Sequence, residues 1–125
     1  MMLAGTMVGV CEALLLAHKA GLDCERLLDL MKNGGAASQI KKDYGTRMLH
    51  RDFGPGFYIE YFVKDLGIVL DECRRLNIAV PGNALAYQFY TMMMAKGRGR
   101  MGYHALLTVL EDMNDMQVRD YSKKL

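Results

Sequence analysis

The sequence predicts an all-α fold built as one domain. Apolar side chains recur at three- and four-residue spacings, Gly and Pro separate these stretches, and no alternating run long enough for a strand appears. A chain of 125 residues with 51% hydrophobic residues suits one globular domain with a modest core. We therefore expect a helical bundle spanning residues 1–125.

The first 17 residues are apolar except for Thr6 and Glu12, which predicts a helix buried on all sides. A membrane span or a signal peptide is the alternative, but the run is short, contains an acid and lacks a basic leading segment. Gly5 and Gly9 would allow another backbone to approach one face closely. Gly21 ends this helix. We expect a core helix and no membrane partner.

Two further helices are predicted before residue 50. Asp23 is placed to cap a helix that continues through Met31 and ends at 33–35, where the sequence is Asn-Gly-Gly. Ser38 precedes an amphipathic stretch at 39–49. The Gly-Pro-Gly sequence that follows is incompatible with continued helix.

The second half of the chain is divided in the same way. We expect a loop at 50–57, a long helix at 58–76, a helix that starts near Pro81 and ends near Lys96, and a last helix at 103–113. The tail after residue 119 is expected to be frayed.

Charge and composition favour no nucleic acid partner. The net charge is +2, with 16 basic and 14 acidic residues spread along the chain. The densest basic cluster, Lys96, Arg98 and Arg100, and the smaller Lys41-Lys42 pair are expected to be solvated surface.

The cysteines and histidines indicate neither disulfides nor a metal site. The cysteines are odd in number without C-x-x-C spacing, which favours a reduced, cytoplasmic location. The histidines are far apart and lack partners at ligand spacing, so no metal is expected. These residues are Cys11, Cys24 and Cys73, and His18, His50 and His104.

Residues 97–102 read Gly-Arg-Gly-Arg-Met-Gly, which matches the G-x-G-x-x-G pattern of dinucleotide-binding turns. That pattern needs a strand before it and a helix and a second strand after it. Here a helical stretch precedes Gly97, and too little chain follows. We interpret these glycines as a helix C-cap and a loop.

One face of the long helix is polar. Glu60, Lys64, Gly67 and Asp71 share this face because they are three and four residues apart. It is either a solvent face with a Glu60–Lys64 ion pair, or a binding face on which Gly67 clears room beside the Lys64 ammonium. The spacing alone leaves both interpretations open.

Several motifs resemble a known family. The run from Asp52 to Phe57 reads D-F-G-P-G-F, the helix after it contains Lys64-Asp-Leu66, and residues 12–23 read E-A-L-L-L-A-H-K-A-G-L-D. In this order and spacing they resemble the C-terminal domain of the β-hydroxyacid dehydrogenases, the family of 3-hydroxyisobutyrate dehydrogenase and tartronate semialdehyde reductase. The resemblance extends from Met1 to about Met113.

The resemblance implies an all-helical C-terminal domain, like that of 6-phosphogluconate dehydrogenase, that closes the active site and mediates homodimerisation. In the family an N-terminal Rossmann domain binds NAD or NADP, and the catalytic lysine lies just upstream of the position of Met1. We therefore expect no catalytic residue, no Rossmann domain and no tightly bound cofactor in this chain. Lys64 and Phe57 match the family residues that reach the cofactor and substrate cleft, and Asp65 is expected to anchor the helix.

The implied activity is that of an NAD(P)-dependent oxidoreductase acting on a small 3-hydroxy acid or its semialdehyde, with this domain inactive alone. One departure concerns the 97–106 segment, where Gly102 and His104 replace the family's usual Asp and Ser. It puts the usual substrate and cleft geometry in question, but not the fold. The alternative is a stand-alone helical dimerisation or interaction module without enzymatic activity.

Overall fold

The computed structural model describes residues 1–32 and 39–123, which form an all-α domain as predicted. The elements are α1 (Met2–Lys19), α2 (Cys24–Lys32), α3 (Gln39–Leu49), α4 (Ile59–Arg75), α5 (Pro81–Ala95), the 3-10 helix η1 (Tyr103–Ala105) and α6 (Leu106–Met113). No strand occurs within these residues, and one isolated antiparallel bridge joins Tyr58 to Gly102. The predicted end of the second helix at 33–35 and the Ser38 cap lie outside the described residues.

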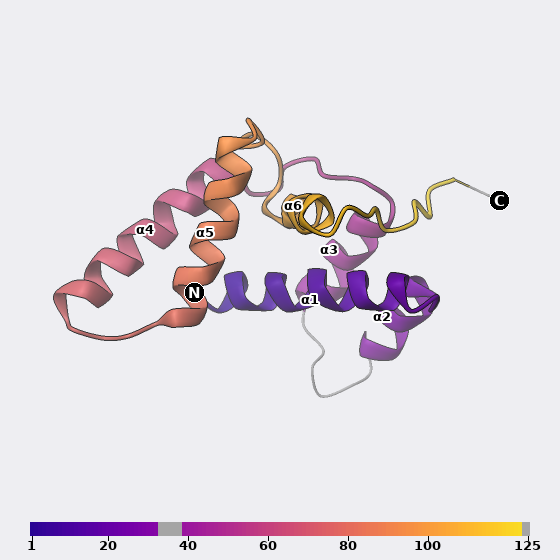
Figure 1. Ribbon diagram of the computed structural model, residues 1–125, viewed down its shortest axis with the longest axis horizontal. Coiled ribbons are helices and arrows are strands. Elements are labelled where there is room, and N and C mark those ends of the chain that lie inside the picture. Colours follow the sequence, from indigo (N-terminus) through magenta and orange to yellow (C-terminus); the bar gives the residue numbers. More distant parts are fainter. Residues whose placement is uncertain (33–38, 124–125) are drawn as a thin grey trace.

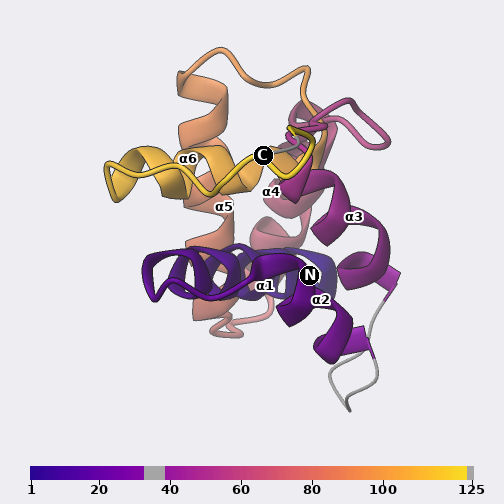
Figure 2. The same cartoon turned by 90° about the vertical axis from the view of Figure 1, so that its right-hand side faces the viewer.

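The helices form a bundle with a protruding hairpin. In Figure 1, α4 and α5 form this hairpin at one end, α1 runs along the molecule, and α2 and α3 lie at the other end. Helix α1 packs against α2, α3, α5 and α6, whereas α4 packs mainly against α5. Figure 2 shows α6 lying over α1. Helix α1 is therefore the central element of the core.

The expectation that α1 is buried on all sides is wrong. Its buried residues lie on one side, whereas Met2 is 89% exposed and Leu16 is 72% exposed. Gly5 and Gly9 lie on the open side, and no atom of another described element comes within 4 Å of the Cβ position of either. By length and composition α1 could cross a membrane, but its other face forms the centre of this core.

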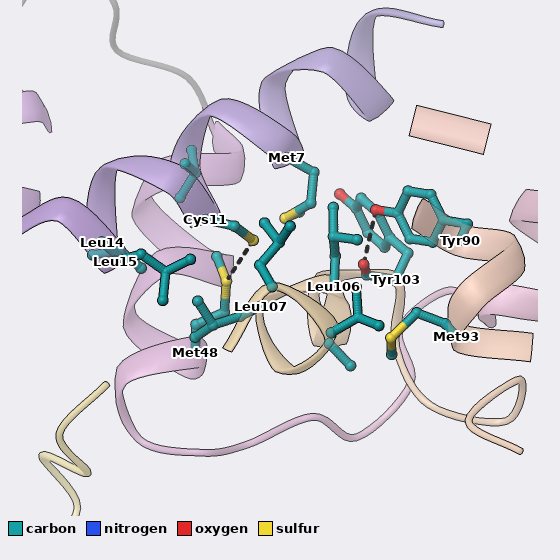
Figure 3. Close-up of a cluster of buried hydrophobic side chains, with 14 of the residues drawn as sticks. Met7, Cys11, Leu14, Leu15, Met48, Tyr90, Met93, Tyr103, Leu106 and Leu107 are labelled. Atoms are coloured by element: carbon teal, nitrogen blue, oxygen red, sulfur yellow. Dashed lines mark hydrogen bonds between the residues drawn. The ribbon is translucent and has the colours of Figure 1, made fainter. Parts of the chain in front are cut away.

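The core is a close-packed cluster of apolar side chains from α1, α3, α5 and α6 (Figure 3). Its polar atoms have partners inside the cluster: the Tyr90 hydroxyl donates to the Tyr103 carbonyl at 2.9 Å, and the Cys11 thiol donates to the Met48 sulfur at 3.7 Å. These hydrogen bonds avoid the free-energy cost of burying unpaired polar groups. Burial also raises the pKa of the Cys11 thiol, so this group stays neutral.

Helix ends follow one recurring motif. After α5, Gly97 adopts φ +72°; its N–H donates to the Met94 carbonyl, and the Arg98 N–H donates to the Met93 carbonyl. This pair of bonds defines a Schellman C-cap, which confirms the interpretation of the 97–102 glycines as a cap and loop. The same motif ends α1 at Gly21.

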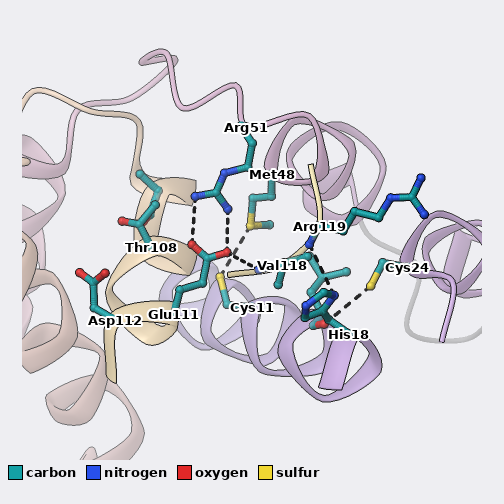
Figure 4. Close-up of polar contacts among 12 residues, drawn as sticks. Cys11, His18, Cys24, Met48, Arg51, Thr108, Glu111, Asp112, Val118 and Arg119 are labelled. Carbon is teal, nitrogen blue, oxygen red and sulfur yellow. Dashed lines mark hydrogen bonds and ion pairs between the residues drawn. The ribbon is translucent and has the colours of Figure 1, made fainter. Parts of the chain in front are cut away.

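Arg51 adopts this left-handed conformation without being glycine or asparagine. Its φ is +56°, its N–H donates to the Met48 carbonyl, and the Asp52 N–H donates to the Arg47 carbonyl. A residue with a Cβ is strained there by about 1–2 kcal/mol. The Arg51 guanidinium makes two bonds to the buried Glu111 carboxylate, at 2.6 and 3.0 Å (Figure 4). This ion pair joins the end of α3 to α6.

The tail is not frayed over its described part. Val118 is buried, and its N–H donates to the Glu111 carboxylate at 2.9 Å. The Tyr121 N–H donates to the Leu49 carbonyl, and the Tyr121 hydroxyl accepts the Cys24 N–H at 3.0 Å. The tail thus packs across α2, α3 and α6, a set of long-range contacts with no periodic signal in the sequence.

Candidate cofactor-cleft site

The site predicted from the sequence begins in the loop between α3 and α4. We call residues 52–57, Asp-Phe-Gly-Pro-Gly-Phe, the P-G-F loop. Three consecutive residues hold it from one side. The Gly102 N–H donates to the Phe53 carbonyl at 3.0 Å, the Tyr103 N–H donates to the Phe57 carbonyl at 3.0 Å, and His104 Nε2 donates to the Asp52 carbonyl at 2.7 Å.

Arg47 of α3 holds the loop from the other side. Its guanidinium makes two bonds to the Asp52 carboxylate, at 2.7 and 3.1 Å, and a third to the Gly54 carbonyl at 2.6 Å. The bond from Arg47, together with one from the Gly54 N–H, lowers the pKa of Asp52 to about 2. A loop without internal helix or strand bonds is therefore fixed by side chains and by the 102–104 segment.

Phe57 lies at the exposed end of this loop. It is 37% exposed, and its ring makes edge contacts with Phe62 of α4 and Tyr103 of η1, with ring centroids 5.9 and 6.4 Å away. These contacts cover part of the Phe57 side chain and leave the rest at the surface. An aromatic side chain held in this way offers a fixed apolar wall.

Lys64 lies on the exposed face of α4. Its side chain is 64% exposed, and its ammonium is 3.1 Å from the Asp65 carboxylate. The Glu60–Lys64 pair of the solvent-face interpretation does not form. Glu60 instead accepts from Arg100 at 2.8 Å, and the Arg100 guanidinium lies over the Tyr58 ring at 4.6 Å. Arg100, in the loop after α5, therefore pairs with the Glu60 carboxylate in place of Lys64.

Gly67 does not clear a space beside Lys64. A Cβ at Gly67 would lie 3.7 Å from Cε2 of Tyr87 on α5, an ordinary packing distance. The residue belongs to the α4–α5 contact, so the ligand interpretation of Gly67 is wrong. The spacing of three and four residues placed Gly67 on the polar face, but the hairpin turns that edge of α4 toward α5.

The basic cluster is paired rather than freely solvated. Lys96 and Arg98 both contact the Asp112 carboxylate, at 3.1 and 2.9 Å, and Arg98 also donates to Thr108. The side chains of Lys41 and Lys42 lie outside the described residues. Across the described ranges, no group of three His, Cys, Asp or Glu side chains is arranged to hold a metal ion, and the three cysteines are free.

Sequence reasoning missed the residues that shape the P-G-F loop. Arg47 lies five residues before Asp52 in an ordinary amphipathic helix, and nothing in the spacing marks it as an anchor. Gly102 and His104 were singled out as departures from a family pattern, yet their contact with the loop is visible only in the fold. Contacts between segments about fifty residues apart leave no local pattern in the sequence.

The fold and this loop define a class of protein: the helical domain of a β-hydroxyacid dehydrogenase. The family model described as "NAD-binding of NADP-dependent 3-hydroxyisobutyrate dehydrogenase" matches residues 1–110. The chain belongs to this family.

Its relatives agree with this assignment. The chain is 50% identical over 117 residues to "Probable 3-hydroxyisobutyrate dehydrogenase-like 1, mitochondrial" of Arabidopsis thaliana, covering 94% of this chain and 35% of the relative. It is 36% identical over 104 residues to "2-hydroxy-3-oxopropionate reductase" of Escherichia coli strain K12, covering 83% of this chain and 36% of the relative.

A solved structure shows the same fold. The 3-hydroxyisobutyrate dehydrogenase from Salmonella typhimurium superposes with a TM-score of 0.78 at 26% identity, covering 86% of this chain and 38% of that one. The chain thus spans little more than a third of the length of these relatives.

Proposed function

We propose that this chain is the C-terminal substrate and dimerisation domain of an NAD(P)-dependent oxidoreductase acting on a small 3-hydroxy acid or its semialdehyde. One observation carries the proposal. The P-G-F loop is fixed from two sides, yet Phe57 at its end stays partly exposed, and α4, which starts two residues later, carries the exposed Lys64. A fixed aromatic side chain and an exposed cation on the helix that follows it suit one side of a cleft whose other side is a separate domain.

The residues present fit a nicotinamide cofactor as partial contributors. Phe57 would supply the apolar wall, and Lys64 would place positive charge near a cofactor phosphate or a substrate carboxylate. The cofactor, when bound, exchanges a hydride with the hydroxyl-bearing carbon. In this proposal Lys64 binds and orients the cofactor phosphate or the substrate carboxylate, and Phe57 excludes water from the cleft. The general acid/base belongs to the segment expected upstream of Met1.

Lys64→Ala in a longer enzyme tests the role of the lysine. A chimera would place the preceding part of the Arabidopsis relative before Met1, so that both sides of the cleft are present. We expect Lys64→Ala to lower turnover or cofactor affinity at least tenfold, because domain closure excludes water and strengthens the charge, while helical content stays unchanged.

Lys123→Ala is the matched control. It removes the same charge from another lysine paired with one aspartate, in the tail at the opposite end of the molecule from the hairpin. We expect the control to keep parental kinetics. Equal activity in Lys64→Ala and the parent would return Lys64 to the solvent-face interpretation.

The isolated chain should bind NAD(H) and NADP(H) weakly and show no dehydrogenase activity. An exposed ammonium alone contributes about 0–1 kcal/mol, as a surface ion pair does. Isothermal titration with each cofactor and a direct assay of nicotinamide reduction check this. Turnover by these 125 residues would contradict the domain assignment.

We also propose that the chain forms a homodimer through the open face of α1. Met2 and Leu16 on this face are the most exposed large apolar residues of the described chain, and the bare Gly5 and Gly9 backbone between them allows close helix approach. Light scattering at micromolar concentration should show twice the chain mass; a well-behaved monomer would contradict the proposed dimer.

The cytoplasmic location stays a prediction, and the Arabidopsis relative is described as mitochondrial.

A further inference from the structure

His104 is a fully buried histidine behind the P-G-F loop. Its ring lies 4.8 Å from the Tyr44 ring and 5.9 Å from the Phe53 ring, measured between centroids. Its Nε2 lies 2.7 Å from the Asp52 carbonyl oxygen. The ring therefore connects the start of the P-G-F loop to η1 across 52 residues of sequence.

The hydrogen bond fixes the tautomer of His104. A carbonyl oxygen can only accept, so Nε2 carries the proton and Nδ1 carries a lone pair. Nδ1 is buried and has no hydrogen-bond partner among the described residues. Burying a neutral acceptor in this way costs less than burying a charged donor without an acceptor.

Gly102 makes room for this edge of the ring. A Cβ at Gly102 would lie 2.5 Å from Cε1 and 2.8 Å from Nδ1 of His104, and 2.8 Å from the Gly54 carbonyl oxygen. Real Cβ atoms do not approach so closely, so the ring in this position requires glycine at 102. In this arrangement no described residue accepts a hydrogen bond from Nδ1.

We propose that His104 is a positioning residue that holds the P-G-F loop, and with it Phe57, only while its imidazole is neutral. Protonation would create a buried Nδ1–H donor that has no acceptor among the described residues. Restoring an acceptor requires the ring, the 102–104 segment or the loop to move. The three bonds from residues 102–104 to the loop form one unit, so this movement reaches the Tyr103–Phe57 bond.

The charged groups around His104 have opposite effects on protonation of its ring. From α3 it is faced by the Arg47 guanidinium and the Tyr44 ring, from the loop by the Asp52 carboxylate, and from its own element by Tyr103. Asp52 favours a cation, but its carboxylate is already held by Arg47. Burial is the largest effect and lowers the pKa of His104, and Arg47 adds to this.

The link to catalysis rests on the function proposed above, because only there does Phe57 line a cleft. The positioning itself is a property of these 125 residues. It can therefore be tested on this chain without cofactor or activity, and its failure would leave the Lys64 test unaffected.

The test is hydrogen exchange of the Tyr103 amide, whose acceptor is the Phe57 carbonyl. Protection factors would be measured by NMR between pH 7.5 and 5 for the parent, His104→Gln and His104→Ala. A glutamine amide can donate to the Asp52 carbonyl but does not titrate. The Tyr90 amide, inside α5, reports on global unfolding in the same samples.

In the parent, the protection of Tyr103 should fall below about pH 6.5, by up to roughly tenfold per pH unit, until the depressed pKa of the closed state is reached. Tyr103 should be less protected than Tyr90 at each pH, because the opening that admits the proton to His104 leaves α5 folded. His104→Gln should stay protected and independent of pH, and His104→Ala should be poorly protected throughout. Parental pH dependence in His104→Gln, or parental protection in His104→Ala, would overturn the proposal.

A second measurement needs no variant. Nitrogen chemical shifts of the His104 ring should show a protonated Nε2 and an unprotonated Nδ1 at pH 7.5, and the Phe57 ring signals should shift with the same midpoint as the His104 ring. A protonated Nδ1 at pH 7.5, or unrelated midpoints, would overturn the proposal even if His104→Gln failed to fold.

Discussion

The Arg51–Glu111 ion pair should be a main determinant of stability, and two substitutions of Arg51 separate its two contributions. Arg51 contributes a side chain that pairs with a buried carboxylate and a backbone held at φ +56°. Arg51→Ala removes the pair and keeps the strain, because alanine has a Cβ. Arg51→Gly removes both.

The structure sets the magnitude. Removing one partner of a buried ion pair costs about 3–5 kcal/mol, because the remaining charge is left uncompensated. Glu111 is 5% exposed but keeps the Val118 N–H, and Arg51 is 21% exposed, so the low end applies, about 3 kcal/mol for Arg51→Ala. Glycine relieves the backbone strain, but its unfolded chain has more conformational entropy to lose, which offsets part of this gain. Arg51→Gly should therefore be more stable than Arg51→Ala by about 1 kcal/mol.

Urea unfolding at equal protein concentration measures these free energies, provided that the slope m is unchanged. Arg74→Ala is the control, because the Arg74–Asp71 pair is exposed on both sides and should matter by less than about 1 kcal/mol. If Arg51→Ala costs no more than Arg74→Ala, the buried pair does not stabilise the fold. If Arg51→Gly is less stable than Arg51→Ala, the backbone at Arg51 is not strained.

Two further predictions concern α4 and the loop. Gly67→Ala should raise the free energy of unfolding by about 1 kcal/mol, because the new Cβ meets Tyr87 at an ordinary distance and alanine favours the helix; a loss of stability in urea would show that the α4–α5 contact needs a bare backbone. Asp52→Asn should lower the melting temperature at neutral pH. Because the folded-state pKa of Asp52 is depressed to about 2, its stabilisation is complete above the unfolded-state pKa and is lost as pH falls through about 2, so parent and variant should converge there. A constant difference down to pH 2 would contradict the Arg47–Asp52 assignment.

Helix positions could be predicted from the sequence because the signals are local. Gly21, Gly97 and Asn77 each end a helix in the left-handed conformation, which glycine and asparagine adopt readily. The Asp23 carboxylate accepts hydrogen bonds from the N–H groups of Glu25 and Arg26, as an N-cap should. The family motifs extended this to the fold. Each of these signals lies within about four residues of the feature that it predicts.

The errors came from predictions that required knowing what each surface meets. Hydrophobicity alone showed that α1 is apolar, but not which of its side chains, such as Met2 and Leu16, the other described helices leave uncovered. Spacing paired Glu60 with Lys64, whereas the competing donor, Arg100, comes from forty residues away. The tail gave no periodic signal because an extended segment is held by single contacts such as the Tyr121 N–H to the Leu49 carbonyl.

The P-G-F loop shows how the two kinds of information combine. Its sequence identifies the family, but a D-F-x-P-G-F run has few internal bonds with which to fix its own shape. That shape is set by Arg47 on one side and by Gly102, Tyr103 and His104 on the other. A Cβ at Gly102 would overlap the His104 ring, so the residues at 102 and 104 constrain each other, and a change at one has to be judged with the other in place. The two departures from the family pattern are therefore coupled to each other, and both residues bond to the backbone of the loop that carries Phe57.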